Sequence, residues 1–331
     1  MDQNKALISQ SLKKIPDGNF DIHQHNSPDE YDTLCIKHLV RSSEGKGKID
    51  VFKVFPGIEL SFHQYLAKQI VFHSKSPDYI LALNYCQNGQ ICWKMRDKSY
   101  VYLGPGNLCL HSLQNYAGSK IVFPLGYYEG IGVALDLLEL KKTCPNVLQE
   151  AGFDAEKIYE KFCLDKKPLR LPPGQNINMV FSLLNELSEN LRIPYYKLKV
   201  QEALLHLQQV EADVNQDIKQ YSTQQIELIQ KIHDFLIQNL DNRYTIEELS
   251  KRYLLNTSLL KSAFKAVYGM PIGTYMKEYR MQQAMRLLRE TDNSIAFIAE
   301  QVGYATPGKF TTSFKKFAHI LPTEYRRIYK R

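Results

Sequence analysis

The last third of the sequence contains an internal repeat with a period of about 50 residues. Three motifs recur at an offset of 49 or 50 residues: Thr245–Ser250 as Ser294–Ala299, Phe264-Lys265 as Phe314-Lys315, and Tyr275 as Tyr325. A sequence that repeats at fixed spacing predicts a repeated supersecondary unit, because each copy places its apolar residues on the same face. The C-terminal region is therefore expected to fold as two similar units in tandem.

Each copy has the signals of a helix, a turn and a second helix. In the first copy Thr245 precedes an apolar-periodic run, and Glu248 three residues later completes a capping-box pattern. The segment Leu255–Ser258 interrupts the period, and a second helix is expected over 259–268. Gly269 then supplies the left-handed residue on which many helices end.

The second copy repeats this order. Ser294 is placed to cap the first helix, Gly303-Tyr304 turns the chain, and a second helix that opens on proline is expected over 307–317. A continuous helix over 274–291 joins the copies and spans roughly 27 Å at 1.5 Å per residue. Two helices that read one face of a duplex in successive major grooves lie about 34 Å apart. The connecting helix can therefore hold the helices expected over 258–268 and 307–317 near that spacing.

The net charge of +7 is confined to this region. The chain holds 42 Lys and Arg and 35 Asp and Glu; 17 and 10 of them fall within 223–331, which leaves 25 of each sign in the first 222 residues. A basic surface on one region favours a polyanionic partner, because neutralising phosphates releases counterions from DNA. A basic surface that only confers solubility is the alternative.

The motifs of this region resemble the DNA-binding domain of the AraC/XylS transcription regulators. The matching residues are Ile246, Leu249 and Ser250; Phe264, Lys265 and Gly269; Arg280, Ala284, Leu287 and Leu288; Ile295, Ile298 and Ala299; Val302, Gly303 and Tyr304; Phe310, Phe314, Lys315 and Lys316; and Pro322, Tyr325 and Arg326. They cover about a quarter of the chain. The resemblance implies a sequence-specific transcription regulator of the activator type, with double-stranded DNA and RNA polymerase as partners.

Four positions depart from the pattern of that family. His319 stands where Gly usually follows the second recognition helix, and Leu321 replaces the usual Ser or Thr before Pro322. These two departures predict a repacked last turn. Ser262 and Thr312 stand where Arg is common in the recognition helices, so the base preference of the family is not transferred to this chain.

Helical phase divides each recognition helix into an inward and an outward face. The inward residues are Leu260, Ala263, Phe264 and Val267 in the first helix and Phe310, Phe314 and Phe317 in the second. The resemblance places base contacts at outward positions: Ser258, Lys261, Ser262, Lys265, Gly308, Thr311 and Thr312. Phosphate contacts, which position a protein without reading sequence, are expected from Lys309, Lys315, Lys316, Arg326 and Arg327. A Thr methyl can meet the thymine methyl group.

The first 135 residues or so have the composition of short strands. Such runs occupy 78–86, 91–95, 99–103, 108–111, 120–123 and 127–135. Asn88-Gly89, between the first two runs, suits the tight turn of a hairpin. Strands at this spacing predict an antiparallel sandwich or barrel. The turn Gly104–Asn107 is similar to one in the cupin-like barrel of the family, which implies an α+β two-domain chain with a cupin-like N-terminal barrel, flanking helices and an all-α C-terminal domain.

Helices are expected between the strands and the repeat. One helix over 154–162 is capped by Asp154. A helix over 178–191 aligns Val180, Leu183, Leu184, Leu187 and Leu191, and a helix over 195–210, entered by Pro194, aligns Leu198, Ala203, Leu204, Leu207 and Val210. Packing on the barrel is the expected use of these faces, and a homodimer interface through 178–210 is the alternative.

Composition shifts then divide the chain into domains. The polar run 213–223 has no apolar period and is interpreted as a linker. It separates an effector-sensing or dimerisation domain, 1–212, from the DNA-binding domain, 224–331. An effector pocket is expected at Tyr85, Trp93, Tyr100 and Tyr102, with packing in the core as the alternative for each.

The identity of the effector is suggested by a second resemblance. Pro56–Leu60, ahead of the barrel, and the helix from Lys199 to Leu204 are similar to the siderophore-sensing pyochelin-regulator branch of the family. This resemblance implies a small-molecule effector, namely an iron-siderophore.

Two other classes of protein are alternatives to the regulator. A cupin-type metal enzyme fused to a DNA-binding domain would use His23-Gln24-His25 with Asp29, but these residues precede the predicted strands, on a segment expected to be mobile. No convergent acid/base constellation is visible, so neither enzymatic activity nor a metal or cofactor is expected. A constitutive DNA-binding protein without an effector is the other alternative. Six scattered cysteines and the lack of an apolar run of roughly 18–20 residues favour a cytoplasmic chain with reduced thiols.

Overall fold

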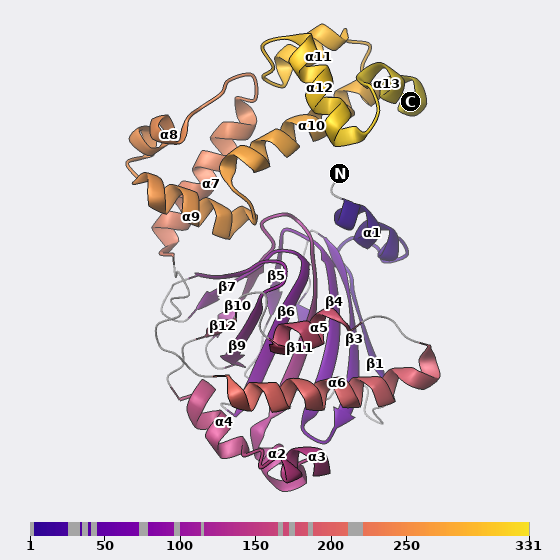
Figure 1. Cartoon of the computed structure of the whole chain (residues 1–331), viewed down its shortest axis with the longest axis vertical. Helices are drawn as coiled ribbons and strands as arrows, with labels where there is room; N and C mark the ends of the chain where they lie inside the picture. The colour runs from indigo at the N-terminus through magenta and orange to yellow at the C-terminus, as the bar shows by residue number, and fades with distance from the viewer. Residues whose placement is uncertain are drawn as a thin grey trace. The chain divides into compact units, whose positions relative to one another are not determined.

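The computed structural model describes residues 3–25, 34, 39–40, 45–72, 79–95, 100–113, 116–164, 168–171, 176–184, 188–210 and 221–330. The chain divides into two compact units, Asp2–Thr223 and Gln224–Arg331, the first rich in strands and the second helical (Figure 1). Most of the predicted linker lies outside the described residues. Tyr221, near its end, is buried, and its carbonyl accepts the N–H of Tyr100, so this residue belongs to the N-terminal unit.

Two sheets form the N-terminal unit. The seven-stranded sheet has the order β1-β3-β4-β11-β6-β9-β12 and the five-stranded sheet the order β2-β5-β10-β7-β8. The strands are β1 (Phe20–His25), β2 (Leu39–Val40), β3 (Lys46–Phe55), β4 (Ile58–Leu66), β5 (Gln69–Phe72), β6 (Ile80–Gly89), β7 (Ile91–Met95), β8 (Tyr100–Leu103), β9 (Leu108–Ser112), β10 (Tyr116–Val122), β11 (Tyr128–Asp136) and β12 (Leu169–Leu171). The described pairs are antiparallel apart from β1 with β3. The predicted β-rich N-terminal region is confirmed.

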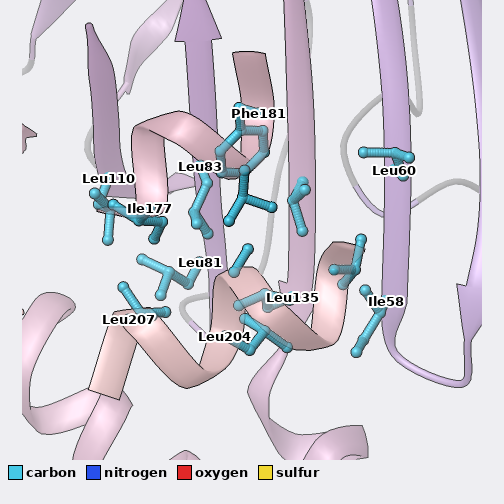
Figure 2. Packing of buried hydrophobic residues seen from close by; sticks show 14 of the residues in the cluster. Ile58, Leu60, Leu81, Leu83, Leu110, Leu135, Ile177, Phe181, Leu204 and Leu207 are labelled. Carbon is cyan, nitrogen blue, oxygen red and sulfur yellow. The ribbon is translucent and has the colours of Figure 1, made fainter. Parts of the chain in front are cut away.

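The seven-stranded sheet is buried on both faces, because successive side chains of a strand point to opposite sides. One face packs against the five-stranded sheet through residues such as Val51, Cys86 and Trp93. The other face is covered by helices, and Figure 2 shows leucine and isoleucine side chains of β4, β6, β9 and β11 meeting α5 and α6. The helices of this unit are α1 (Gln3–Ser11), α2 (Leu137–Thr143), α3 (Asn146–Glu150), α4 (Ala155–Phe162), α5 (Asn176–Ser182) and α6 (Glu189–Gln209).

The predicted hairpin at Asn88-Gly89 is wrong. β6 continues to Gly89 and belongs to the seven-stranded sheet, whereas β7 pairs with β8 and β10 in the other sheet. Gly89 does have the positive φ that the prediction required, 77°. A Cβ there would lie 2.4 Å from the carbonyl oxygen of Tyr127, so glycine is needed where the chain turns the corner between sheets.

The predicted helix boundary at Pro194 is also wrong. α5 ends at Ser182, and α6 begins at Glu189 and continues through Pro194. Because α5 and α6 are separate helices, the apolar residues of 178–191 do not lie on one helical face. Leu183 and Leu191 are each 55% exposed. Within α6 the buried residues are Tyr196, Val200, Ala203, Leu204 and Leu207, whereas Leu198 is exposed, and Leu187 lies outside the described residues. The predicted Asp154 cap of α4 is confirmed, since its carboxylate accepts two main-chain N–H groups.

Two N-terminal segments expected outside the sheet lie within it. His23 and His25 are on β1, which pairs with β3, and not on a mobile segment. Pro56 and Gly57 form the turn of the β3–β4 hairpin rather than a lead into the barrel. Both errors have one cause. The strands before residue 78 carry more polar residues than the later ones, so the sequence pattern does not predict them as individual strands.

The C-terminal unit consists of helices, as predicted. They are α7 (Thr223–Gln238), α8 (Ile246–Tyr253), α9 (Thr257–Tyr268), α10 (Ile272–Glu290), α11 (Ile295–Gln301), α12 (Pro307–Ala318) and α13 (Pro322–Tyr329). α10 has 19 residues and runs between α7–α9 and α11–α13 (Figure 1). Among the described residues, none of the helices is both long and apolar enough to cross a bilayer.

Candidate nucleic-acid interface

The first helix-turn-helix unit is formed by α8 and α9. The hydroxyl of Thr245 accepts the N–H of Glu248 at 3.1 Å, and the Glu248 carboxylate accepts the N–H of Thr245 at 2.7 Å, which confirms the capping box. The N–H of Thr245 and its hydroxyl both donate to the Glu248 carboxylate, and these two hydrogen bonds lower the pKa of Glu248. Asn256, which the sequence prediction missed, caps α9 by accepting the N–H of Leu259, so α9 begins at Thr257 and not at 259.

The two faces of α9 differ as helical phase predicted. Leu260, Ala263, Phe264 and Val267 are buried in the core. On the opposite face Ser258, Lys261 and Lys265 are exposed. Ser262 is half-buried, and its hydroxyl donates to the carbonyl of Leu259 at 3.2 Å. Three of the four proposed base-reading side chains of α9 are thus fully available to a ligand.

The second unit is formed by α11 and α12. The hydroxyl of Ser294 accepts the N–H of Phe297, and the hydroxyl of Thr306 accepts the N–H of Lys309, so both helices have side-chain caps. Phe310 and Phe314 are fully buried and Phe317 packs against the same cluster. The opposite face exposes Gly308, Lys309, Thr312, Lys315 and Lys316, whereas Thr311 is half-buried.

The hydroxyl of Thr312 is used within α12. It donates to the carbonyl of Gly308, one helical turn earlier, at 3.0 Å. The methyl group of Thr312 therefore remains for contact with a partner. Gly308 has no neighbour within 4 Å of the position that a Cβ would occupy, so a flat patch of main chain is exposed beside the threonine.

The predicted repacking of the last turn after α12 is wrong. His319 adopts the left-handed conformation with φ 61°, and its N–H donates to the carbonyl of Lys315. Gly269, its counterpart in the first unit, has φ 80° and donates to the carbonyl of Lys265 in the same way. The chain thus keeps the geometry of a glycine cap with a histidine. α13 starts after Leu321, whose N–H donates to the carboxylate of Glu324, while the leucine side chain offers no acceptor to the first N–H groups of the helix.

The basic side chains proposed for phosphate contacts fall into two groups. Lys309, Lys315, Lys316 and Arg327 are exposed. Arg326 is half-buried, and its Nη2 donates to the carbonyl of Asn293 at 2.5 Å, so part of its guanidinium binds the domain itself. Lys251, in the last turn of α8, is a further exposed cation of the first unit.

A set of hydrogen bonds joins the two helix-turn-helix units beside α10. Arg280, in the middle of α10, is 9% exposed and donates to the carbonyls of Leu240 and Asn242. Arg243 donates to the carbonyl of Gly303 at 3.1 Å and lies over the ring of Tyr304. The turn of the second unit is therefore anchored to the segment that follows α7. The sequence marked Arg280 as a motif residue but gave no reason for it.

The four residues expected to line an effector pocket do not come together. Tyr85 packs on Phe181 beneath the helices, with ring centroids 5.8 Å apart. Trp93 lies in the cluster between the two sheets, on the other face of the seven-stranded sheet. Tyr100 and Tyr102 are neighbours on β8, with ring centroids 6.5 Å apart. None of them lines the cavity of about 330 Å³ that the described residues of this unit form beside α6.

His25, one of the two histidines considered as metal ligands, has other contacts. His25 stacks on Phe52 with a centroid separation of 4.4 Å, and its Nε2 lies 3.3 Å from the carboxylate of Asp50. Within the described ranges, no three His, Cys, Asp or Glu side chains converge as a metal site would require. Asp29 lies outside those ranges.

Comparison with known proteins agrees with the tandem helix-turn-helix geometry. Residues 249–328 match the family described as "Helix-turn-helix domain". The HTH-type transcriptional activator RhaR of Mannheimia succiniciproducens is 31% identical over 111 residues, which cover 34% of this chain and 40% of RhaR. The multiple antibiotic resistance protein MarA of Salmonella typhimurium is 28% identical over 98 residues, 30% of this chain and 77% of MarA.

A solved structure also matches this region. The C-terminal domain of the two-component response regulator yesN from Fusobacterium nucleatum is 33% identical and covers 29% of this chain and 95% of that domain, with a TM-score of 0.28. The fold and the family match define the C-terminal unit as a tandem helix-turn-helix domain. More narrowly, it is a domain of the AraC type. The chain spans less than half the length of RhaR.

Proposed function

We propose that the protein is a sequence-specific DNA-binding transcription regulator in which α9 and α12 enter two adjacent major grooves. One observation carries this proposal: two capped helices expose small polar and basic residues and are held in one unit by α10 and Arg280. With 19 residues, α10 is about 28 Å long, close to the roughly 34 Å between successive grooves. The excess of basic residues in this unit supports the same partner.

Within this proposal the exposed residues of the two helices divide by role. Ser258, Lys261, Ser262 and Lys265 of α9 and Gly308, Thr311 and Thr312 of α12 contact base edges. Lys309, Lys315, Lys316, Arg326 and Arg327 bind phosphates and fix the register of the domain on DNA. The exposed methyl of Thr312, whose hydroxyl is bonded to Gly308, favours thymine at the base it meets.

The N-terminal unit is proposed to sense a small-molecule effector and to transmit its presence to transcription by RNA polymerase. Its support is a cavity of about 330 Å³, within the range of sites that bind small molecules. The proposal includes a homodimer through 178–210. Its support is that Leu191 and Leu198 on α6 expose apolar side chains that a second copy could cover. In this scheme residues 1–212 respond to the effector and residues 224–331 bind the operator.

The test begins with sequencing of the genomic fragments that the purified full chain retains, which yields an operator. Gel-shift titrations then compare that operator with random DNA. Lys261→Ala and Thr311→Ala are expected to weaken operator binding more than random-DNA binding, because base contacts carry specificity. Lys277→Ala, which removes an exposed cation from α10, is the matched control and should leave the ratio unchanged. Equal losses on both DNAs would show that these residues do not read bases.

A further inference from the structure

The recognition helices α9 and α12 each pack a phenylalanine against a tyrosine of the helix that follows, with the same geometry in both copies of the repeat. The ring of Phe264 on α9 lies 5.6 Å from that of Tyr275 on α10, at an interplanar angle of 75°. The ring of Phe314 on α12 lies 5.5 Å from that of Tyr325 on α13, at 77°. The two tyrosines are equivalent residues of the repeat, so the partners of their hydroxyl groups can be compared directly.

Those two hydroxyl groups have different partners. The hydroxyl of Tyr325 accepts a hydrogen bond from the Nη1 of Arg289, near the end of α10, at 3.2 Å. The hydroxyl of Tyr275 lies 2.8 Å from the Nε2 of His233 on α7. In both copies the partner belongs to the helix that precedes the helix-turn-helix unit, which is α7 for the first unit and α10 for the second. Each pair therefore links the helix before a unit to the helix after it.

The contacts of His233 fix which of its ring nitrogens carries the hydrogen. Its Nδ1 lies 3.0 Å from the carboxylate of Asp234, which accepts, so Nδ1 carries the hydrogen and Nε2 accepts from the hydroxyl of Tyr275. Burial lowers the pKa of His233, and the hydrogen bond with Asp234 raises it only in part. The ring is therefore neutral at pH 7, as its role as an acceptor requires.

His233 also packs against the end of α9. Its ring is stacked on that of Tyr268, the last residue of α9, with centroids 4.3 Å apart and an interplanar angle of 12°. Tyr268 is 4% exposed, and its ring lies 4.6 Å from that of Phe264 on the same helix. One histidine thus contacts α9 by stacking and α10 by a hydrogen bond. Its loss would remove a stacking partner of Tyr268 and the acceptor of Tyr275.

The orientation of α9 decides where its outward side chains lie. Ser258 and Lys261 stand near the start of α9, roughly 10–15 Å from Tyr268 at 1.5 Å per residue. A tilt at the Tyr268 end therefore displaces both side chains, while the charge and the exposed surface of the unit stay the same. Hydrogen bonds to base edges weaken steeply when their geometry is lost, whereas neutralisation of phosphates depends on charge. A misplaced α9 should thus lose specific binding before non-specific binding.

We propose that His233 is a positioning residue for DNA recognition: it joins α7 to α9 and α10 and so fixes the orientation in which α9 meets its half-site. This inference rests on the proposed function, because it assigns a role within the DNA-binding unit. Arg289 has the corresponding place in the second copy, where its guanidinium bonds Tyr325 beside α12. Each half-site of the operator then depends on its own positioning residue.

The experiment is a fluorescence-anisotropy titration of the full chain with the operator and with two versions in which one half-site is scrambled. The half-site whose binding Lys261→Ala weakens is assigned to α9. His233→Ala should weaken binding to that half-site about ten-fold or more and binding to the other less than about two-fold, since Tyr275 loses its acceptor and Tyr268 a stacking partner. His233→Gln has an amide oxygen that can accept from Tyr275, so it should restore most of the affinity.

Three further variants complete the comparison. Gln230→Ala changes an exposed residue of α7 and should bind both half-sites as the wild type does. Arg289→Met should show the opposite selectivity and weaken the half-site of α12. His233→Phe keeps a ring on Tyr268 but has no acceptor, so it provides the same test if His233→Ala does not fold. Circular dichroism of each variant reports whether it is folded.

The proposal is overturned if the His233 variants weaken both half-sites equally, or leave both unchanged, while Lys261→Ala remains selective. It is also overturned if His233→Gln binds the half-site of α9 no better than His233→Phe, because the hydrogen bond to Tyr275 then has no part in recognition. If Lys261→Ala instead weakens operator and random DNA equally, the proposed function is wrong and this inference falls with it. The two failures are therefore distinguishable.

Discussion

Arg280 donates a hydrogen bond from Nη2 to the carbonyl oxygen of Asn242 at 2.7 Å, and it bonds the carbonyl of Leu240 through Nε. The middle of α10, the helix that connects the two helix-turn-helix units, is thereby fixed to the segment after α7. Gly303, the turn residue of the second unit, packs on the same segment, because a Cβ there would lie 2.3 Å from the Leu240 carbonyl. One buried arginine thus contributes to the relative placement of the two helix-turn-helix units.

Arg280→Met should destabilise the C-terminal unit by about 2–3 kcal/mol, because two carbonyls lose a charged donor at a buried position. Binding to an operator with both half-sites should also fall more than binding to one half-site, since the spacing of the readers is no longer fixed. Urea unfolding followed by circular dichroism measures the first effect, and gel shifts on full and half operators measure the second.

The matched control for that variant is Arg286→Met, which removes an exposed arginine from the same helix. It should change the free energy of unfolding by less than about 0.5 kcal/mol. If Arg280→Met behaves like this control in both measurements, the hydrogen bonds to Leu240 and Asn242 do not hold the units together.

Leu254→Gly should stabilise the C-terminal unit by about 1 kcal/mol. Leu254 ends α8 in the left-handed conformation, with φ 53°, and its side chain is 92% exposed. An L-residue in that conformation is disfavoured by about 1–2 kcal/mol relative to glycine, and the exposed side chain gains nothing by packing. Gly303 occupies the equivalent place in the second copy, with φ 74°. The measurement is the midpoint of urea unfolding.

Two further variants separate backbone strain from side-chain effects at these positions. Leu254→Ala keeps a Cβ in the left-handed region and should leave stability nearly unchanged. Gly303→Ala should destabilise by about 2 kcal/mol or more, because it adds strain and a clash with the main chain of Leu240. If Leu254→Gly is no more stable than Leu254→Ala, strain at this turn is not relieved by glycine.

Features that depend on a few neighbouring residues could be predicted from the sequence, whereas features that depend on long-range contacts could not. Caps such as Thr245 and Ser294 act within four residues, and the structure confirms them. The corner at Gly89 was mistaken for a hairpin because its positive φ suits both, and only long-range pairing with Tyr128 on β11 decides which strand it extends. Proline favours the first turn of a helix, so the sequence predicts a helix start at Pro194; α6 nevertheless continues through it, because the loss of one internal hydrogen bond is tolerated when tertiary packing holds the helix.

The candidate effector site shows the same limit more strongly. The cavity of about 330 Å³ in the N-terminal unit is lined by Asp50 on β3, Glu129 on β11 and Arg192 on α6, which are far apart in sequence. No periodicity or motif relates these residues, so the sequence does not predict that they line one cavity. The aromatic residues of neighbouring strands pointed instead to a pocket at Trp93 and its neighbours. The exposed face of α9 was easier to predict, because the phase of one helix separates exposed Lys261 from buried Phe264.

His319→Gly should stabilise the end of α12 by about 1 kcal/mol. His319 has φ 61° and caps the helix with the same hydrogen bond as Gly269 in the first copy. Glycine adopts this conformation without the steric clash of a Cβ. The matched variant His319→Ala removes the imidazole but keeps the strain, and it should fall at or below the wild type in urea unfolding. An equal gain in both variants would assign the effect to the imidazole instead.

Acidification should weaken the N-terminal unit through two histidines buried inside it. Burial lowers the pKa of His63 to about 4 and that of His111 to about 3, from 6.5 in the unfolded chain. Above pH 6.5 both states are neutral at these groups. As the pH falls below 6.5 the unfolded chain takes up protons that the folded chain refuses, so stability decreases until the folded pKa is reached.

Between pH 6.5 and pH 5 each group should remove about 2 kcal/mol from the free energy of unfolding, since one pKa unit corresponds to about 1.4 kcal/mol. Urea titrations followed by Trp93 fluorescence, which reports on this unit alone, give the loss directly. His63→Gln should be less stable than the wild type at pH 7, because His63 bonds Ser61 and Tyr65. Its stability should nevertheless fall less on going to pH 5. A drop as large as that of the wild type would mean that His63 does not titrate between the two states.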